Sequence, residues 1–231
     1  MRIWDIGAGF LNDQSLLGEH RELHGIYSII SNNKKGYSRH PETLRWVSHL
    51  SSLEVRHGLL VEEMMLRGFK HHSPLTSDPT DLNWPSTFID EPSGQYRLLK
   101  GKYKDKKQGR IPLPVNTQTL WASHKYSVMA RDPSAAKKLG NQIANDEISF
   151  EELSEILVRL LRTSPQSGRL ANAVSHMWGY ISDHSEVDPQ RISAGEQLSI
   201  IQEASIQFDF DYLLHSTALS ELKFWSEFHC S

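Results

Sequence analysis

Glu22 is the first residue whose surroundings point to chemistry. The stretch LLGEHRELHGIY, residues 16–27, places Gly18 and Gly25 about one helical turn to either side of it, with Arg21 beside it. Each glycine costs a helix interior about 0.5–1 kcal/mol relative to alanine. Taken alone, these residues favour a solvated carboxylate or a structural ion pair, with the glycines allowing close helix packing. A carboxylate that stabilises positive charge in a reaction is the alternative.

The second candidate group is the α-amino group at the start of the chain. Arg2 is bulky, and we expect it to block removal of the initiator methionine, so that the mature chain begins at Met1. An α-amino group has a reference pKa of about 7.7–8.0, so roughly a tenth of it is free base at neutral pH. Ile3 and Trp4 follow directly and indicate an arm docked on a core. A fixed amine of this kind is a nucleophile for an aldehyde-like carbon, through Schiff-base chemistry.

Histidines offer a third chemistry. His20 and His24 are one helical turn apart, a spacing that can chelate zinc. The stretch EHRELH is not an H-E-x-x-H motif, however, and no third ligand stands at a diagnostic spacing. We therefore expect neither a metal nor another cofactor. A metal-dependent hydrolase built from histidines remains an alternative.

A basic segment could bind nucleic acid. The formal charge of the 231 residues is −3, which does not by itself indicate a nucleic-acid-binding protein. Residues 95–110, QYRLLKGKYKDKKQGR, nevertheless hold seven Lys or Arg against one Asp, a local net charge of +6. Lysines neutralise phosphates, and Tyr96 and Tyr103 could stack on bases. A solvated linker is the other interpretation.

The single cysteine, Cys230, excludes an internal disulfide and suits a reducing cytosol. The first ten residues resemble neither a signal peptide nor a membrane span. We expect a cytoplasmic, nucleoid-associated protein that has no membrane partner. The sequence does not set its oligomeric state.

Helical periodicity predicts an all-α fold that positions these groups. We expect one helix from Asp13 to Ser31, capped by Asn12 or Asp13, and a second from Glu42 to Leu66 that ends at Gly68. Residues 70–115 hold most of the prolines and predict a long irregular segment. The later helices are predicted at Thr117–Arg131, Pro133–Asn145, Ser149–Arg162, Gln166–Asp183, Pro189–Ile206 and from about Asp209.

Three regions follow from this pattern. Residues 1–75 form one helical domain, residues 76–115 a Pro-rich and Lys-rich irregular segment, and residues 116–231 a second helical domain.

The first region resembles the pyrimidine-dimer DNA glycosylase family of the phage endonuclease V type. The matching residues are Arg2-Ile3, Asp13-Gln14, Arg21-Glu22-Leu23 and Arg67-Gly68-Phe69, and the spacing from the amine to Glu22 has no gap. The resemblance implies an endonuclease-V-like helical domain with DNA glycosylase and AP-lyase activity in base excision repair. In such an enzyme the Met1 amine attacks C1′ of a damaged or modified pyrimidine nucleotide, the base leaves, and an imine forms.

Further roles follow from the same resemblance. Glu22 would stabilise the developing sugar cation and assist proton transfers, Arg21 would hold a phosphate, and the glycines would leave a hollow for the sugar. Double-stranded DNA is the expected partner. The residues expected to contact it are Arg2, Gln14, Arg21, Lys34, Lys35, Arg39, Lys102, Lys104, Lys106 and Lys107. A DNA-binding or partner-binding module without catalysis is the alternative.

The chain departs from the phage-type pattern in three ways. Gly25 stands where that enzyme has a second helical arginine, Met1 stands where it exposes a threonine, and its aromatic C-terminal tail has no clear match. A lesion other than the pyrimidine dimer is therefore compatible with the sequence.

The last region resembles the helical domain of YbgA-type proteins over about residues 116–225. The matching residues are His124, Lys125, Tyr126, Gly168, Asn172, His176, Gly179 and Tyr180. The resemblance implies no particular activity. Asn172 and His176 are one turn apart and could line a pocket, but burial of both in the core is the favoured interpretation.

Overall fold

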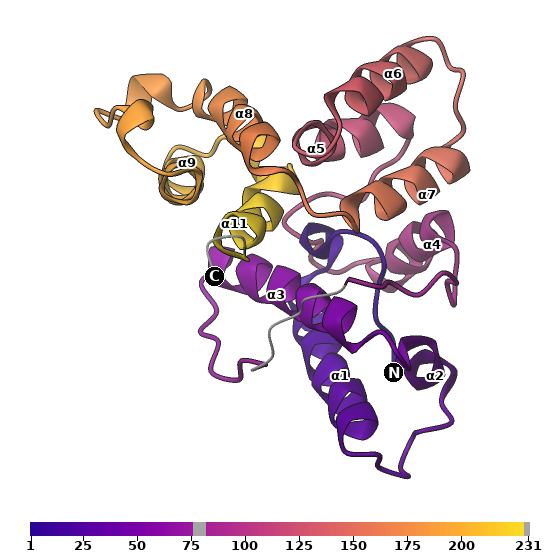
Figure 1. Cartoon of the computed structure of the whole chain (residues 1–231). Helices are drawn as coiled ribbons and strands as arrows, with labels where there is room; N and C mark the ends of the chain where they lie inside the picture. Colours follow the sequence, from indigo (N-terminus) through magenta and orange to yellow (C-terminus); the bar gives the residue numbers. More distant parts are fainter. Residues whose placement is uncertain (76–81, 229–231) are drawn as a thin grey trace.

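The computed structural model describes residues 1–75 and 82–228, and within those ranges all regular structure is helical (Figure 1). The all-α prediction is confirmed. In the same ranges no helix is long and apolar enough to cross a membrane. Cys230 lies outside the described residues. The α-helices are α1 (Asp13–Ser31), α2 (Pro41–Trp46), α3 (Leu50–Leu66), α4 (Pro92–Lys102), α5 (Thr117–Met129), α6 (Pro133–Ala144), α7 (Phe150–Leu161), α8 (Ser167–Trp178), α9 (Ala194–Gln207), α10 (Asp211–Leu214) and α11 (Ala218–Phe228).

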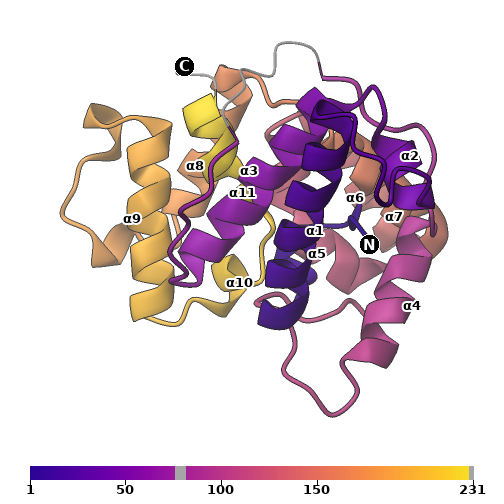
Figure 2. The ribbon, with the colours of Figure 1, turned by 90° about the horizontal axis from the view of Figure 1, so that it is seen from below.

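Helix α1 has the bounds that the sequence predicts. The Asn12 side chain caps it by accepting a hydrogen bond of 2.9 Å from the Ser15 N–H. The apolar stripe of Leu16, Leu23 and Ile26 is fully buried, and α1 packs against α3. Figure 2 looks onto α1 with the N-terminus beside it.

The single helix predicted over residues 42–66 is wrong. The chain breaks between α2 and α3, where Ser48 has a φ of +67°. A left-handed conformation is disfavoured for residues other than glycine, so the sequence gives little warning of this break. The break allows α2 to lie against the first residues of the chain, where Arg45 donates a hydrogen bond of 3.0 Å to the Ile3 carbonyl.

The predicted irregular segment contains helix α4, so that prediction is wrong for Pro92–Lys102. Tyr96, Leu99 and Tyr103 are buried in the core, and Tyr103 Oη accepts a hydrogen bond of 2.9 Å from the Asn12 N–H. Neither tyrosine is free to stack on a base, which corrects that expectation. Residues 92–103 therefore pack against the protein core through their apolar side and are not a solvated linker.

Two apolar cores share helix α3. Leu53 and Leu60 enter one core with the first residues of the chain and with α4, α6 and α7. Val55, on another side of α3, enters the second core with α8, α9 and α11. Helix α5 also contributes to both cores. The predicted division of the chain at residue 116 therefore stays a prediction.

Residues 2–11, here called the arm, run through the protein in a largely irregular conformation. Extended backbone in a core must still satisfy its carbonyl groups. Three arginines do this by donating hydrogen bonds of 3.0, 3.0 and 2.7 Å to the carbonyls of Ile3, Ile6 and Leu11. Each arginine is paired with a buried glutamate. The pairs are Arg45–Glu42, Arg56–Glu19 and Arg67–Glu63.

Glu63 joins three parts of the chain. It is fully buried and binds Arg67 at 2.7 Å, Arg110 at 2.7 Å and the Ser220 hydroxyl at 2.7 Å. Burial alone raises the pKa of this carboxyl, but the Arg110 and Arg67 guanidiniums outweigh burial and lower the pKa to about 2. Arg110 also donates to the Leu214 carbonyl. Glu63 thus connects the arm, through Arg67, to the C-terminal helices.

Replacing Glu63 with glutamine leaves two buried arginines without their shared negative charge. We expect Glu63→Gln to lower the free energy of unfolding by about 3–5 kcal/mol, measured by urea denaturation at pH 7. Glu155→Gln is the matched control, because Glu155 forms an exposed pair with Arg159 at 2.8 Å. Glu155→Gln should lower the free energy of unfolding by less than about 1 kcal/mol.

The same comparison carries a pH signature. A carboxyl whose pKa is lowered from 4.5 to about 2 stabilises the fold above pH 4.5, and this contribution is lost as the pH falls through 2. The difference in free energy of unfolding between the wild-type protein and Glu63→Gln should therefore shrink as the pH falls from 4.5 to about 2. Equal losses for both variants at pH 7 would contradict the assignment.

Candidate active site

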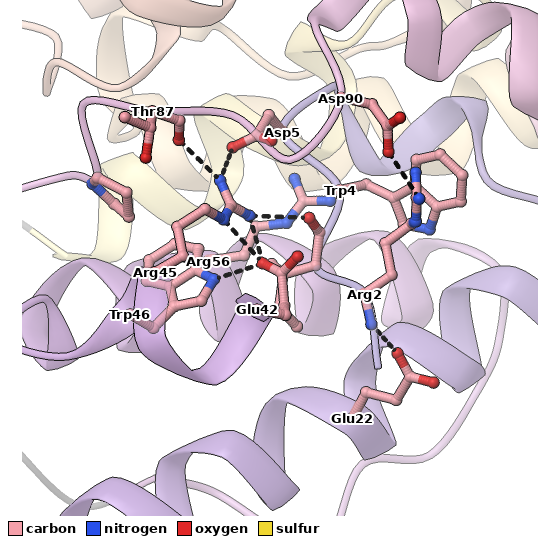
Figure 3. Close-up of polar contacts among 12 residues, drawn as sticks. Arg2, Trp4, Asp5, Glu22, Glu42, Arg45, Trp46, Arg56, Thr87 and Asp90 are labelled. Atoms are coloured by element: carbon pink, nitrogen blue, oxygen red, sulfur yellow. Dashed lines mark hydrogen bonds and ion pairs between the residues drawn. The ribbon is translucent and has the colours of Figure 1, made fainter. Parts of the chain in front are cut away.

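The carboxylate of Glu22 contacts the start of the chain. Its Oε2 atom accepts a hydrogen bond from the backbone N–H of Arg2, the residue that follows Met1 (Figure 3). In residues 1–75 and 82–228, its Oε1 atom has no hydrogen-bond partner. Glu22 and Met1 are both half-buried. The two groups that the sequence predicts to react therefore lie in one neighbourhood.

Other contacts fix this end of the arm. The Trp4 N–H donates a hydrogen bond of 3.1 Å to Glu19, whose carboxylate binds Arg56 at 2.8 and 2.9 Å. Burial raises the pKa of Glu19, and the Arg56 guanidinium opposes that shift. The Arg2 side chain turns away to Asp90 at 2.6 Å and lies over the Trp4 ring, as Figure 3 shows. The backbone beside the amine is thus held from several sides.

A hollow of about 390 Å³ opens beside Glu22. This volume is within the range of small-molecule sites, and the hollow is open to solvent. It contains four residues predicted from the sequence, namely Arg2, Gln14, Glu22 and Lys102. The complete lining is Arg2, Trp4, Gln14, Ser15, Gly18, Glu19, Glu22, Leu98 and Lys102.

The two glycines do not serve close helix packing. A Cβ atom added at Gly18 or at Gly25 would meet no heavy atom within 4 Å. Gly18 lines the hollow, as expected, whereas Gly25 is absent from the lining. The open space beside Glu22 therefore depends on Gly18.

The structure places the other predicted DNA contacts along α1. Gln14 and Arg21 are exposed on the helix itself. Lys104 and Lys106 are exposed in the loop after α4, and Lys107 pairs with Asp13 at 3.1 Å at the start of α1. At the other end of α1, the following loop holds Lys34, Lys35 and Arg39, all exposed.

These cations form two groups at opposite ends of α1. A helix of 19 residues spans about 28 Å, which equals roughly eight base pairs of a duplex at about 3.4 Å per pair. Glu22 lies between the two groups, and the hollow extends from it toward Gln14 and Lys102. Such an arrangement can bind one stretch of DNA backbone across the hollow.

Sequence reasoning missed three residues at this site. Glu19 stands three positions before Glu22, and that helical spacing was a usable signal. Asp90 and Leu98 lie in the segment predicted to be irregular, so their placement beside the arm depends on α4, which the sequence analysis did not find.

Two sequence interpretations about side chains need correction. His57 and His71 join His20 and His24, so the pair does have further candidate ligands in space. Asn172 and His176 are exposed on α8, so neither is satisfied in a core.

Comparisons with known proteins agree with the two resemblances. Residues 1–77 match the model of a family described as pyrimidine dimer DNA glycosylase. Residues 125–194 match the model of a family described as a protein of unknown function, DUF1722. These matches confirm the order of the two regions along the chain. Comparison with curated proteins and with solved structures gave no match.

Alanine substitutions can test the open space around the helical glycines. Gly18→Ala and Gly25→Ala should each raise the free energy of unfolding by about 0.5–1 kcal/mol, because the added methyl meets open space and alanine favours the helix. Gly58→Ala is the control on α3, where the new Cβ would lie 2.2 Å from the Phe224 ring and should destabilise the fold. Urea denaturation measures all three. Destabilisation by the first two would restore the close-packing interpretation.

Proposed function

We propose that this chain is a DNA glycosylase with AP-lyase activity that uses the Met1 amine as its nucleophile. The observation that carries the proposal is the hydrogen bond between Glu22 and the arm at the edge of an open hollow. It lies within the residues that match the glycosylase family.

The reaction needs only an amine, a carboxylate and water. The amine lone pair attacks C1′, and the bond from C1′ to the base breaks, so that its electron pair leaves with the base, which takes up a proton. The nitrogen then loses one proton, and its lone pair forms a C=N bond as the C1′–O4′ bond breaks and O4′ takes up a proton, which opens the sugar ring and leaves a protonated imine. Removal of a C2′ proton expels the 3′ phosphate oxygen from C3′, and water finally hydrolyses the imine. No redox partner enters this sequence.

Glu22 acts where charge develops. Positive charge forms at the sugar as the base leaves, and a fixed carboxylate in a partly enclosed hollow stabilises it. Oε2 keeps the arm in place through the Arg2 N–H, while Oε1 faces no partner in the described residues and can exchange protons. The buried Ile3 and Trp4 keep the amine from moving away.

The substrate is double-stranded DNA that carries a damaged or modified pyrimidine. The two groups of cations along α1 bind the phosphate backbone. Lys102, the last residue of α4, adds a positive charge at the hollow itself. The nucleotide that reacts must leave the duplex to reach C1′, and a hollow of about 390 Å³ accepts its sugar.

A hydrolase built on histidines is less consistent with this geometry. His20 and His24 stand two residues before and after Glu22, about 160° away around the helix axis. Their cluster therefore faces away from the hollow.

Covalent trapping tests the identity of the nucleophile. Borohydride should reduce the imine formed with a duplex that contains an abasic site, and peptide mapping should find the adduct at the Met1 nitrogen. Lys102 is the competing amine, since it lines the hollow, whereas Met1 precedes the lining residue Arg2. Lys102→Arg keeps the positive charge and should leave trapping unchanged, whereas an uncleaved N-terminal tag should abolish it. An adduct on Lys102 would show that the Met1 amine is not the nucleophile.

Substitution of Glu22 tests the role of the carboxylate. Glu22→Gln keeps an oxygen that can accept the Arg2 N–H but removes the charge. We expect a loss of about 10²–10³ in the single-turnover rate of base release and little change in DNA affinity. Single-turnover kinetics and a binding titration measure the two effects separately. A rate within threefold of the wild-type rate would make Glu22 only a fixing point for the arm.

A further inference from the structure

Four histidine rings gather on the side of α1 that faces away from Glu22. His20 and His24 belong to α1, His57 belongs to α3, and His71 follows α3 in the chain. One ring nitrogen from each lies within 4.8 Å of those of the other three. The ring centroids are 4.7–5.1 Å apart in the five pairs that touch.

The spacing fits a tetrahedral metal centre. A zinc ion with Zn–N bonds of about 2.0–2.1 Å places its ligand nitrogens about 3.3 Å apart. The Nε2 atoms of His20 and His24 are 3.3 Å apart, a distance at the long end for the hydrogen bond between the two rings. All four candidate ligand nitrogens lie within 4.8 Å of one another, and binding an ion would draw them to the same spacing.

Hydrogen bonding does not account for all four rings. The Ser73 hydroxyl lies 3.4 and 3.3 Å from the Nε2 atoms of His24 and His71, at the long end for hydrogen bonds. His57 is 5 % exposed, and its Nε2 atom is buried with no hydrogen-bond partner. A buried polar atom without a partner is costly, and a metal ion would bind it.

Burial disfavours the charged form of all four rings. Burial, reinforced by the neighbouring rings, lowers the pKa of His57 to about 3 and that of His20 to about 4. Burial also lowers the pKa of His24 and His71.

We propose that His20, His24, His57 and His71 form a structural zinc site that fixes α1 to α3 and to the segment after α3. Imidazole is a good ligand for zinc, and four protein ligands leave no open position for a substrate. The proposal does not rest on the glycosylase activity, because the cluster lies on the other side of α1. By fixing the rotation of α1, the ion would keep Glu22 turned toward the arm.

Metal analysis of the full chain tests this site. The protein must be purified without a histidine tag, and its zinc content measured by plasma mass spectrometry. We expect about one zinc per chain, and chelator-treated protein should regain it from added Zn²⁺ with a rise in melting temperature of about 5–10 °C at a hundredfold excess over the dissociation constant. Added Co²⁺ should give the visible absorption of a tetrahedral complex.

Single substitutions assign the ligands. His71 is partly exposed, so His71→Gln should fold, lose the cobalt absorption and bind zinc at least about tenfold more weakly. His72→Gln is the matched control at the exposed neighbouring position and should bind normally. Absence of zinc together with absence of a cobalt spectrum would overturn the proposal. Equal zinc binding by wild-type protein and His71→Gln would overturn it as well.

Discussion

The position of the candidate site depends on how the arm is held. A chain segment without regular structure inside a core leaves carbonyl groups that need donors. Here guanidinium groups supply the donors, and each guanidinium needs a buried carboxylate, since an unpaired buried charge would be far more costly. Arg45, Arg56 and Arg67 meet both demands at successive points of the arm. A frayed terminus thereby becomes a fixed one, and its first residues reach Glu22.

The C-terminal helices take part in the same constraint. Arg162, at the end of α7, binds Asp5 of the arm at 2.7 Å, and Ser220 on α11 binds the glutamate that orients Arg67. Ser220 lies beyond the region that matches a family of unknown function, whereas Arg162 connects that region to the arm. The structural contribution of that region is therefore to fix the arm, whatever further activity it has. The two apolar cores likewise share α3 and α5.

The sequence predicted what local patterns encode. Helix α1 follows from its cap and apolar spacing, and its contact with the chain start followed from the family resemblance. Helix α4 also had a signal, because Tyr96, Leu99 and Tyr103 follow helical spacing, but the surrounding lysines obscured it. The break at Ser48 had no signal, since serine does not favour a positive φ. The histidine cluster joins residues from separate elements, which only the tertiary packing of α1 on α3 brings together.

Helix α1 distributes its tasks around its circumference. At about 100° per residue, Gln14, Gly18, Arg21 and Gly25 lie about 40–100° from Glu22 in the same direction around the helix axis. The buried stripe occupies the other side, and the histidines follow beyond it. Gln14 and Arg21 are the exposed polar residues of this face, and the glycines add no side chains that would project from it. One helix thus carries an open polar face, a carboxylate at the edge of that face and a core behind it. Any rotation of α1 would displace all three together, so its packing against α3 is the feature on which the geometry of the hollow depends.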